Sequence, residues 1–512
     1  MIAHEVMTAP AVVVGGGIAG LSTALALEGC VLAGSAIGDG SSRLAQGGIA
    51  AAIAADDSPA LHAADTLRVS AGLGNADIAA LVTEAAPARV AWLREAGVAF
   101  DCRADGQLIL GREAGHRRDR IVHAGGDRTG AAVMGALREA TLRRPDIRVL
   151  EGYSLVDLIT CGARTAGVLL ESKDGRRLAV LAANVVLATG GIGACFTRST
   201  NPATSTGAGL AAAARRGLTL ADLEFVQFHP TALAGEGRPA PLLTEALRGA
   251  GAVILDDTGR RFMRSVHPDA ELAPRDVVAR SVAALEVAGR QVLLDATGVP
   301  ELEIRFPGAC AIARAAGIDP RRQPLPVTTA AHFHMGGIAT DAQGATSLAG
   351  LWACGEIAST GLHGGNRLAS NSLLEGLVFG ECIARAIRAV ALPSPTGRLE
   401  VPRSALPVRA DAERIQRLRR IVGDGLGPLR DAATMSAALG MLDAWQPASR
   451  AEADHVLVAR LMLAAAIARR ESRGAHYRAD HPRAVPGPGT RSFVAPRAAP
   501  VEALEFARSR VA

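Results

Sequence analysis

A glycine-rich segment directly after a short apolar run most constrains how this chain can fold. Ala11–Val14 reads Ala-Val-Val-Val, and residues 15–20 follow as Gly-Gly-Gly-Ile-Ala-Gly. This order predicts a strand, a tight turn and a helix of small residues. In such a unit one glycine makes the turn, a second admits a pyrophosphate to the backbone, and a third lets the helix pack on the strand. The segment therefore predicts a Rossmann-like dinucleotide-binding domain.

Two further apolar runs fit this kind of domain but argue against a simple NAD site. Residues 30–33 form a run that ends at Gly34, where NAD-binding folds place an acidic residue that holds a ribose hydroxyl. Residues 185–188 form another run, which ends in Gly190 and Gly191. A second glycine-ended strand so far along the chain predicts a dinucleotide fold whose halves are separated in sequence.

The texture of the sequence changes between residues 223 and 334, where turns and prolines interrupt short apolar runs. The sequence pattern typical of a nucleotide-binding domain returns at Gly350. A proline-rich linker follows at residues 393–407, and Arg- and Ala-rich amphipathic patterns come after it. A chain of 512 residues is also too long for one ordinary core. We therefore expect an α/β fold with a Rossmann-like nucleotide-binding domain at 1–222 and 335–400, an inserted α+β capping domain at 223–334 and a C-terminal helical domain at 401–512.

Composition and patterning argue against several classes of protein. The net charge of +5 comes from Arg residues that alternate with acids, and ten Phe, three Trp and two Tyr offer few stacking platforms, so we expect no nucleic-acid partner. Seven cysteines without a C-x-x-C pair predict neither a disulfide framework nor a metal site. No apolar run reaches the roughly 18 residues of a membrane helix, and no export signal is visible, so we expect a soluble, cytoplasmic protein.

Residues 41–48 read Ser-Ser-Arg-Leu-Ala-Gln-Gly-Gly and offer hydroxyls, an amide and flexible backbone N–H groups. These groups suit the pyrophosphate and polar ring edge of a flavin, and a Gly-rich surface loop is the alternative interpretation. With the glycine turn and later segments they define a predicted set of cofactor-binding residues. The set comprises Gly15, Gly16, Gly17, Ile18, Ala19, Gly20, Ser41, Ser42, Arg43, Leu44, Ala45, Gln46, Gly47, Gly48, Ser154, Leu155, Thr189, Gly190, Glu356, Ser372 and Leu373.

Five further blocks stand in order along the chain: residues 224–231 (EFVQFHPT), 243–249 (LTEALRG), 272–276 (LAPRD), 331–337 (AHFHMGG) and 366–373 (NRLASNSL). With the glycine motifs they make the chain, from about Ala11 to Pro482, resemble the flavoprotein family of succinate dehydrogenase, fumarate reductase and L-aspartate oxidase. The resemblance implies that the nucleotide-binding domain binds FAD and that the substrate is a small dicarboxylate.

The blocks contain donors and cations sufficient to hold two carboxylates: His229, His332, Thr244, Arg275 and Arg367. Taken singly, each has a structural alternative; Arg275, for instance, could simply pair with Asp276. The resemblance implies that Arg275 transfers a proton, that the other four bind substrate carboxylates, and that Glu245 orients them. We therefore predict that Arg275, Glu113, His229 and His332 are catalytic and that Thr244, Glu245 and Arg367 bind substrate.

Two features favour the aspartate-oxidising members of this family. Covalent members carry a flavin-bearing His where this chain has Ser41, so we expect non-covalent FAD. Glu113 lies in a segment, residues 112–116, that resembles the one in which a Glu meets the substrate's amino group. Alternatively, Glu113 pairs with a neighbouring Arg on a loop.

The expected reaction is oxidation of L-aspartate to iminoaspartate, with oxygen or fumarate as acceptor. Its product would feed quinolinate and NAD biosynthesis, with a functional link to quinolinate synthase. The alternatives are a soluble fumarate reductase or succinate dehydrogenase flavoprotein and a non-catalytic flavin-binding subunit.

Three positions depart from the family pattern. Ala208 replaces the Asp of a T-G-D-G motif, Gly34 stands where Lys is common, and Ala114 replaces a Gly after Glu113. These departures concern the affinity for FAD rather than its identity.

Overall fold

The glycine turn near the N-terminus lies at the carboxyl end of a parallel sheet. In the computed structural model β3 (Ala11–Val14) runs into the turn, and α1 (Ile18–Ala26) leaves it. The five-stranded sheet has the order β19-β12-β3-β4-β8 and pairs in parallel throughout. Its other strands are β19 (Leu351–Ala353), β12 (Asn184–Leu187), β4 (Cys30–Gly34) and β8 (Ile147–Glu151). The strand partners β12 and β19 come from distant sequence, which confirms a Rossmann-like domain interrupted by other segments.

The structure describes residues 2, 3, 5–235, 237–390, 392, 397–402, 406, 410–503 and 505–506. Most of the linker predicted at 393–407 lies outside these residues. No helix in the described part of the chain is both long enough and apolar enough to cross a membrane.

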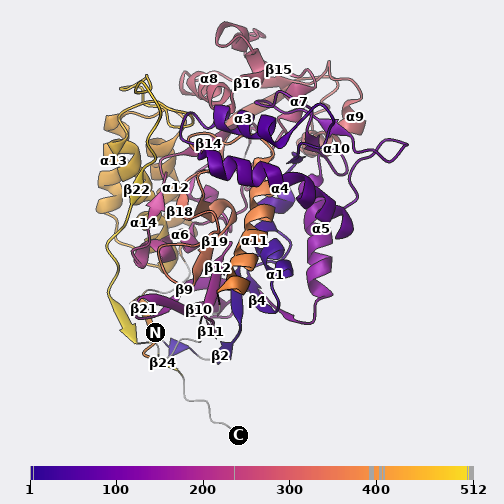
Figure 1. Cartoon of the computed structure of the whole chain (residues 1–512). Helices are drawn as coiled ribbons and strands as arrows, with labels where there is room; N and C mark the ends of the chain where they lie inside the picture. Colours follow the sequence, from indigo (N-terminus) through magenta and orange to yellow (C-terminus); the bar gives the residue numbers. More distant parts are fainter. Residues whose placement is uncertain are drawn as a thin grey trace.

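Two glycines of the turn are required by close packing. A Cβ on Gly15, whose φ is +131°, would lie 2.0 Å from the carbonyl oxygen of Ala188, and one on Gly20 would lie 1.9 Å from that of Gly15. Helix α11 (Asn371–Ala389) packs across α1 through Gly376 and Gly380 (Figure 1). The first and last segments of the nucleotide-binding domain therefore share one core.

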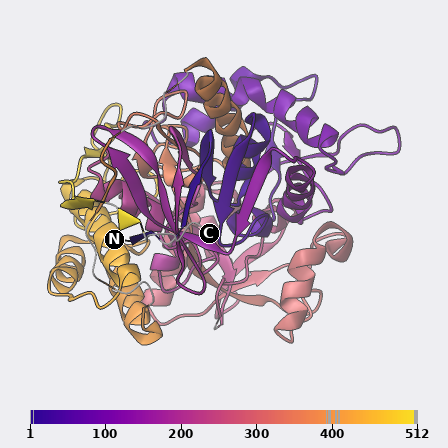
Figure 2. The same cartoon turned by 90° about the horizontal axis from the view of Figure 1, so that it is seen from below.

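A second sheet of six strands has the order β2-β11-β10-β9-β21-β23. These strands are β2 (Glu5–Thr8), β11 (Arg177–Leu181), β10 (Arg164–Ser172), β9 (Tyr153–Cys161), β21 (Glu400–Pro402) and β23 (Val501–Ala503). Segments from both ends of the chain therefore join one sheet. Figure 2 views the molecule from this end, with strands in the middle and helices around them.

The cap at the top of Figure 1 is a four-stranded antiparallel sheet of order β14-β17-β16-β15, covered by α8 (Arg275–Val287). Its strands are β14 (Val226–Leu233), β17 (Leu325–His334), β16 (Val292–Asp295) and β15 (Val253–Asp256). The cap has its own apolar core, in which Leu243, Val278 and Leu294 are fully buried. This arrangement confirms the predicted α+β capping domain.

Three helices form the C-terminal bundle: α12 (Ala412–Leu426), α13 (Ala432–Asp443) and α14 (Arg450–Ala468). The predicted helical character ends at Ala468. Later described residues form no helix, and β22 (Phe493–Val494) instead pairs with β13 (Leu220–Ala221). The helix ends where the C-cap residue Arg469 takes an extended conformation, with φ −79° and ψ +101°. Further along, prolines at 482, 486 and 488 disfavour a helix because proline has no N–H to donate.

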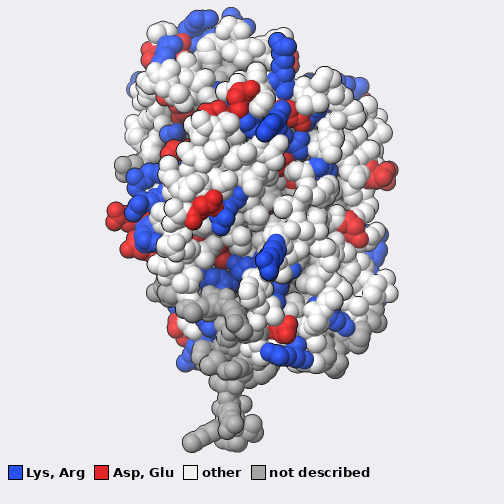
Figure 3. Space-filling view, turned by 90° about the vertical axis from the view of Figure 1, so that its left-hand side faces the viewer, with Lys and Arg blue, Asp and Glu red and all other residues white. Residues whose placement is uncertain are grey.

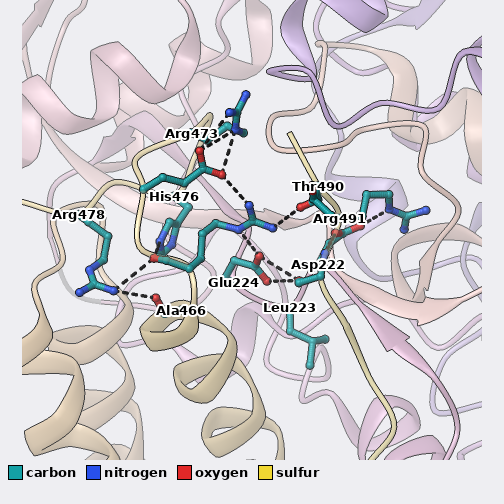
Figure 4. A network of polar contacts seen from close by, with 12 residues as sticks. Asp222, Leu223, Glu224, Ala466, Arg473, His476, Arg478, Thr490 and Arg491 are labelled. Carbon is teal, nitrogen blue, oxygen red and sulfur yellow. Dashed lines mark hydrogen bonds and ion pairs between the residues drawn. The ribbon is translucent and has the colours of Figure 1, made fainter. Parts of the chain in front are cut away.

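Buried ion pairs anchor this C-terminal segment to the chain just before β14 (Figure 4). The carboxylate of Glu224, fully buried, accepts hydrogen bonds from Arg469 Nε at 2.5 Å and from Ser492 Oγ at 2.8 Å. Arg491 Nε donates to Asp222 Oδ2 at 2.6 Å. Because each of these buried charges is paired, the segment and the cap entrance hold one another in place.

Charge on the surface is mixed. Figure 3 shows Lys and Arg interspersed with Asp and Glu on the face it views, without a continuous basic stripe there. Several cysteines outside any disulfide are buried in the interior, among them Cys30, Cys195 and Cys354.

Candidate active site

A cavity of about 760 Å³ lies where the carboxyl ends of β3, β4 and β12 face the cap. This volume falls within the range of roughly 300–1,000 Å³ that is usual for ligand sites. All seven residues predicted to be catalytic or substrate-binding line it, and so do all predicted cofactor-binding residues except Gly20 and Arg43. Gly20 acts through packing of α1. Arg43 is exposed and lies 3.7 Å from Asp39, so the structure removes it from the cavity wall.

The nucleotide side of the cavity fits FAD. Gln46 Oε1, Thr189 Oγ1 and Ser372 Oγ line it, are buried and have no hydrogen-bond partner among the described residues. Buried polar atoms of this kind call for a polar ligand. A Cβ on Gly190, whose φ is +74°, would meet no atom within 4 Å, so this turn opens toward the space for a cofactor.

Two arginines from different elements meet at one glutamine. Gln227, on β14 and fully buried, accepts at Oε1 from Arg275 Nη1 at 3.0 Å and from Arg367 Nη2 at 2.9 Å. Arg275 Nε also donates to Glu245 Oε2 at 2.7 Å. Arg367 stacks on Phe333, 5.0 Å from the ring centroid. The result is a pair of fixed guanidinium groups that suit a dicarboxylate.

We call the predicted catalytic and substrate-binding residues other than Glu113 the carboxylate clamp: Arg275, Arg367, Glu245, Thr244, His229 and His332. Burial and like charge change its acid–base properties. Burial, and then the positive charge of Arg275, lower the pKa of Arg367 to about 9. Burial alone would raise the pKa of Glu245, but Arg275 and Arg248 beside it lower the pKa overall. The clamp therefore contains a carboxylate whose charge offsets part of the positive charge of the arginines around it.

Two histidines complete the clamp: His229 is buried and His332 is half-buried. Burial, and then Arg275, lower the pKa values of His229 and His332 well below the ordinary value, so both imidazoles are neutral. The rings pack edge to face, with centroids 5.1 Å apart. His229 Nδ1 accepts from the backbone N–H of Thr231 at 3.2 Å, so neutral His229 carries its hydrogen on Nε2. It therefore offers an N–H donor to a carboxylate.

Glu113 lines the same cavity from a different loop. Its Oε2 accepts a hydrogen bond from Ser370 Oγ at 2.6 Å, and the side chain is 5% exposed. Ser370 has φ +61°, a left-handed conformation that is uncommon for serine and places it at the start of α11. The ion pairs that the sequence allowed between Glu113 and Arg112, Arg117 or Arg118 do not form, because these arginines pair with Asp119, Asp65 and Asp56.

Sequence reasoning missed four residues of this environment: Gln227, Phe333, Ser370 and Arg248. The first three lay inside motifs that had been noticed, but only tertiary contacts show their roles. Arg248 is fully buried and lies 3.5 Å from Glu245. A cation three residues after Glu245, in the motif at residues 243–249, was the available signal.

The three departures from the family pattern are accommodated locally. Ala114 keeps a negative φ while Gly115 takes φ +90°, so the turn needs only one glycine. Ala208 is the first residue of α6 (Ala208–Arg215) and lines the cavity. Gly34 also lines the cavity at the end of β4.

Comparison with protein families agrees with this geometry. The FAD binding domain model matches residues 11–373, and the fumarate reductase flavoprotein C-terminal model matches residues 447–491. The fold and site are therefore those of an FAD-binding flavoprotein. L-aspartate oxidases of Mesorhizobium japonicum and Caulobacter vibrioides are 46% and 45% identical, with 94% of this chain covered in both and 93% and 95% of theirs. The chain belongs to the L-aspartate oxidase family.

Solved structures show the same architecture. A quinol fumarate reductase subunit of E. coli superposes with a TM-score of 0.87 at 26% identity, covering 99% of this chain and 98% of its own. Sdh1 of Mycobacterium smegmatis gives 0.79 at 30% identity, with coverages of 98% and 95%. The FAD-binding, capping and helical domains are thus shared with fumarate reductase flavoproteins; the exact boundaries at 222, 334 and 400 stay predictions.

Proposed function

We propose that this protein binds FAD without a covalent bond and oxidises L-aspartate to iminoaspartate, with oxygen or fumarate as the final electron acceptor. The observation that carries the proposal is the position of Glu113. This carboxylate lines the same cavity as the Arg275–Arg367 pair and is held by Ser370 instead of by an arginine. An α-ammonium group entering a site of cations needs such a carboxylate, whereas succinate and fumarate do not.

The residues of the chain divide the work of binding. Arg367, Thr244 and the two neutral histidines hold the two carboxylates, which fixes the carbon between them. Bound FAD supplies the acceptor for the hydride that leaves the substrate Cα. Glu113 binds the amino group and orients it. Fixing the reacting carbon in this way can contribute several kcal/mol to lowering the barrier.

Proton transfer is assigned to Arg275. Its Nε and both Nη atoms are engaged by Glu245 and Gln227, so the guanidinium has one orientation in the site. Glu245 acts as the residue that positions it.

Non-covalent attachment follows from the side chain at position 41. Ser41 Oγ accepts from Asn201 Nδ2 at 3.2 Å and lines the nucleotide side of the cavity, where covalent members of the family have a histidine. Acid precipitation of the holoprotein tests this: the yellow colour should stay in the supernatant, and colour in the pellet would contradict it.

Iminoaspartate made by this reaction would pass to quinolinate synthase for NAD biosynthesis in the cytoplasm. We infer this place from the unstable product of the proposed reaction and from the family.

The proposed reaction is tested by mixing the holoprotein with L-aspartate without oxygen. The visible absorbance of the oxidised flavin should bleach and then return on addition of oxygen or fumarate. Succinate is the control, because it has both carboxylates but no amino group. Bleaching by succinate but not by L-aspartate would favour a fumarate reductase or succinate dehydrogenase, and no bleaching by either would favour a non-catalytic subunit.

A further inference from the structure

Buried hydrogen bonds and ion pairs hold the loop that carries Glu113. Residues 112–120 connect β6 (Leu110–Gly111) with β7 (Ile121–Val122) and end at Arg120, which is fully buried. Arg120 donates to both oxygens of Asp57, at 2.8 and 2.9 Å, and to Asp65 at 2.8 Å. Removing one partner of such a buried pair leaves an uncompensated charge, so this end of the loop is fixed.

A tight turn joins this fixed end to Glu113. The backbone N–H of His116 donates to the carbonyl of Glu113 at 3.1 Å, and Gly115 takes φ +90°, which the third position of a type II turn requires. Glu113 and His116 thus stand at the two ends of one turn. The backbone position of His116 therefore constrains that of Glu113.

His116 in turn binds the segment that holds the Glu113 carboxylate. Arginine has no acceptor, so the 3.3 Å contact between Arg120 Nη1 and His116 Nδ1 makes Nδ1 the acceptor. The hydrogen of His116 is therefore on Nε2, which donates to the carbonyl of Ala369 at 2.9 Å. Ala369 directly precedes Ser370, whose hydroxyl donates to Glu113. These hydrogen bonds form a closed circuit that connects Glu113, Ser370, Ala369 and His116.

Most contacts that hold the carboxylate clamp lie outside this circuit, although Arg367 stands two residues before Ala369 and its Nη1 donates to the carbonyl of Leu368 at 3.5 Å. Arg367 is held by Gln227 and Phe333, and Arg275 by Glu245 and Gln227. Loss of the His116 contact would therefore displace the group that faces the substrate's amino group more than the groups that face its carboxylates.

We propose that His116 is a positioning residue that fixes Glu113 and thereby sets the preference of the enzyme for a dicarboxylate bearing an α-amino group. The proposal rests on the proposed function. It makes His116 act through Glu113, without touching substrate.

The test compares His116→Leu with His116→Gln in the FAD-loaded protein, using kcat/KM for L-aspartate oxidation and for fumarate reduction. Leucine removes the donor to Ala369, whereas the glutamine amide N–H can replace Nε2. We expect His116→Leu to lower the aspartate value at least tenfold and the fumarate value less than threefold. His116→Gln should restore the aspartate value to within threefold of wild type.

His455→Leu is the matched control, because His455 is also a buried neutral imidazole but lies on α14 in the helical bundle. The ratio of the two activities should not change in this variant. If His116→Leu does not retain FAD, His116→Asn takes its place, since its shorter amide cannot reach Ala369, and it must lower the ratio by the same factor.

Parallel loss of both activities, no loss of aspartate oxidation, or a glutamine variant as poor as leucine would overturn the proposal. Its failure is distinct from failure of the proposed function: a wild-type protein that does not oxidise L-aspartate contradicts the function, whereas an active wild type with an unchanged ratio in the variants contradicts only the role of His116.

Discussion

At the scale of single residues, the proposed proton transfer depends on how Arg275 is held. Its guanidinium donates to Glu245 and to Gln227 at the same time, which only a planar group with several N–H donors can do. Charge alone at this position is therefore insufficient.

Arg275→Lys should fold and keep FAD but lose at least a hundredfold in kcat, or about 2.7 kcal/mol of transition-state stabilisation, because an ammonium group cannot make both contacts. Turnover of L-aspartate and of fumarate, with FAD content measured in parallel, checks this. A variant with near wild-type kcat for both reactions would remove Arg275 from the chemistry.

The variant Glu113→Gln tests recognition of the substrate's amino group separately from recognition of its carboxylates. The amide keeps the size of the side chain but not the charge, so L-aspartate oxidation should fall more than tenfold, a loss of more than about 1.4 kcal/mol. Fumarate reduction should fall much less, since fumarate has no ammonium group. Steady-state kinetics of both reactions decide the matter; an equal loss in both would indicate a structural role for Glu113.

At the scale of elements, the glycine turn acts on FAD partly through a residue that does not touch it. Gly20 lies outside the cavity wall, yet a Cβ there would collide with the backbone of Gly15. The packing of α1 on β3 therefore sets the position of the loop that faces the cofactor.

Gly20→Ala should accordingly weaken FAD binding, because α1 must shift to admit the methyl group. The purified variant should contain less than half of the FAD found in wild type, with the dissociation constant measured by quenching of flavin fluorescence. Gly135→Ala on α5 (Thr129–Leu142) is the control, since a Cβ there meets no atom within 4 Å. Full FAD content in Gly20→Ala would show that the helix adapts.

The same elements show what the sequence can and cannot predict. The strand at Ala11–Val14 and the clamp residues were predictable, because each lies in a short motif whose residue types carry its chemistry. The bond between Glu113 and Ser370 joins residues 257 positions apart, and Gln227 and Arg367 are 140 apart. Nothing local distinguishes such contacts, since they arise only when the domains pack. The proline-rich tail from Pro482 to Pro500 was predictable as extended chain, but its pairing with Asp222 and Glu224 was not.

At the scale of the whole molecule, buried histidines couple stability to pH. Burial lowers the pKa of His62 to about 3 and those of His334 and His455 to about 4. In the unfolded chain they titrate near 6.5, so below that pH the unfolded state binds more protons and is favoured. Glu356 acts in the opposite direction, because burial raises its pKa to about 7.

The free energy of unfolding should therefore fall between pH 7 and pH 5, by about 2 kcal/mol for each of these histidines. Urea denaturation of the FAD-free protein at both pH values measures it. His455→Gln should reduce the fall by about that amount, and a fall as large as in wild type would mean that His455 is not kept neutral by the fold.

Burial of the thiols affects how well the protein resists oxidation during turnover. If oxygen accepts the electrons, as proposed, its reduction gives hydrogen peroxide beside the protein, and peroxide attacks the thiolate form of cysteine. Burial raises the pKa values of Cys30, Cys195 and Cys354 to about 12, so at neutral pH only on the order of one molecule in 100,000 carries a thiolate at each. These three interior thiols should therefore resist such peroxide, whereas the exposed Cys102 presents a more accessible sulfur.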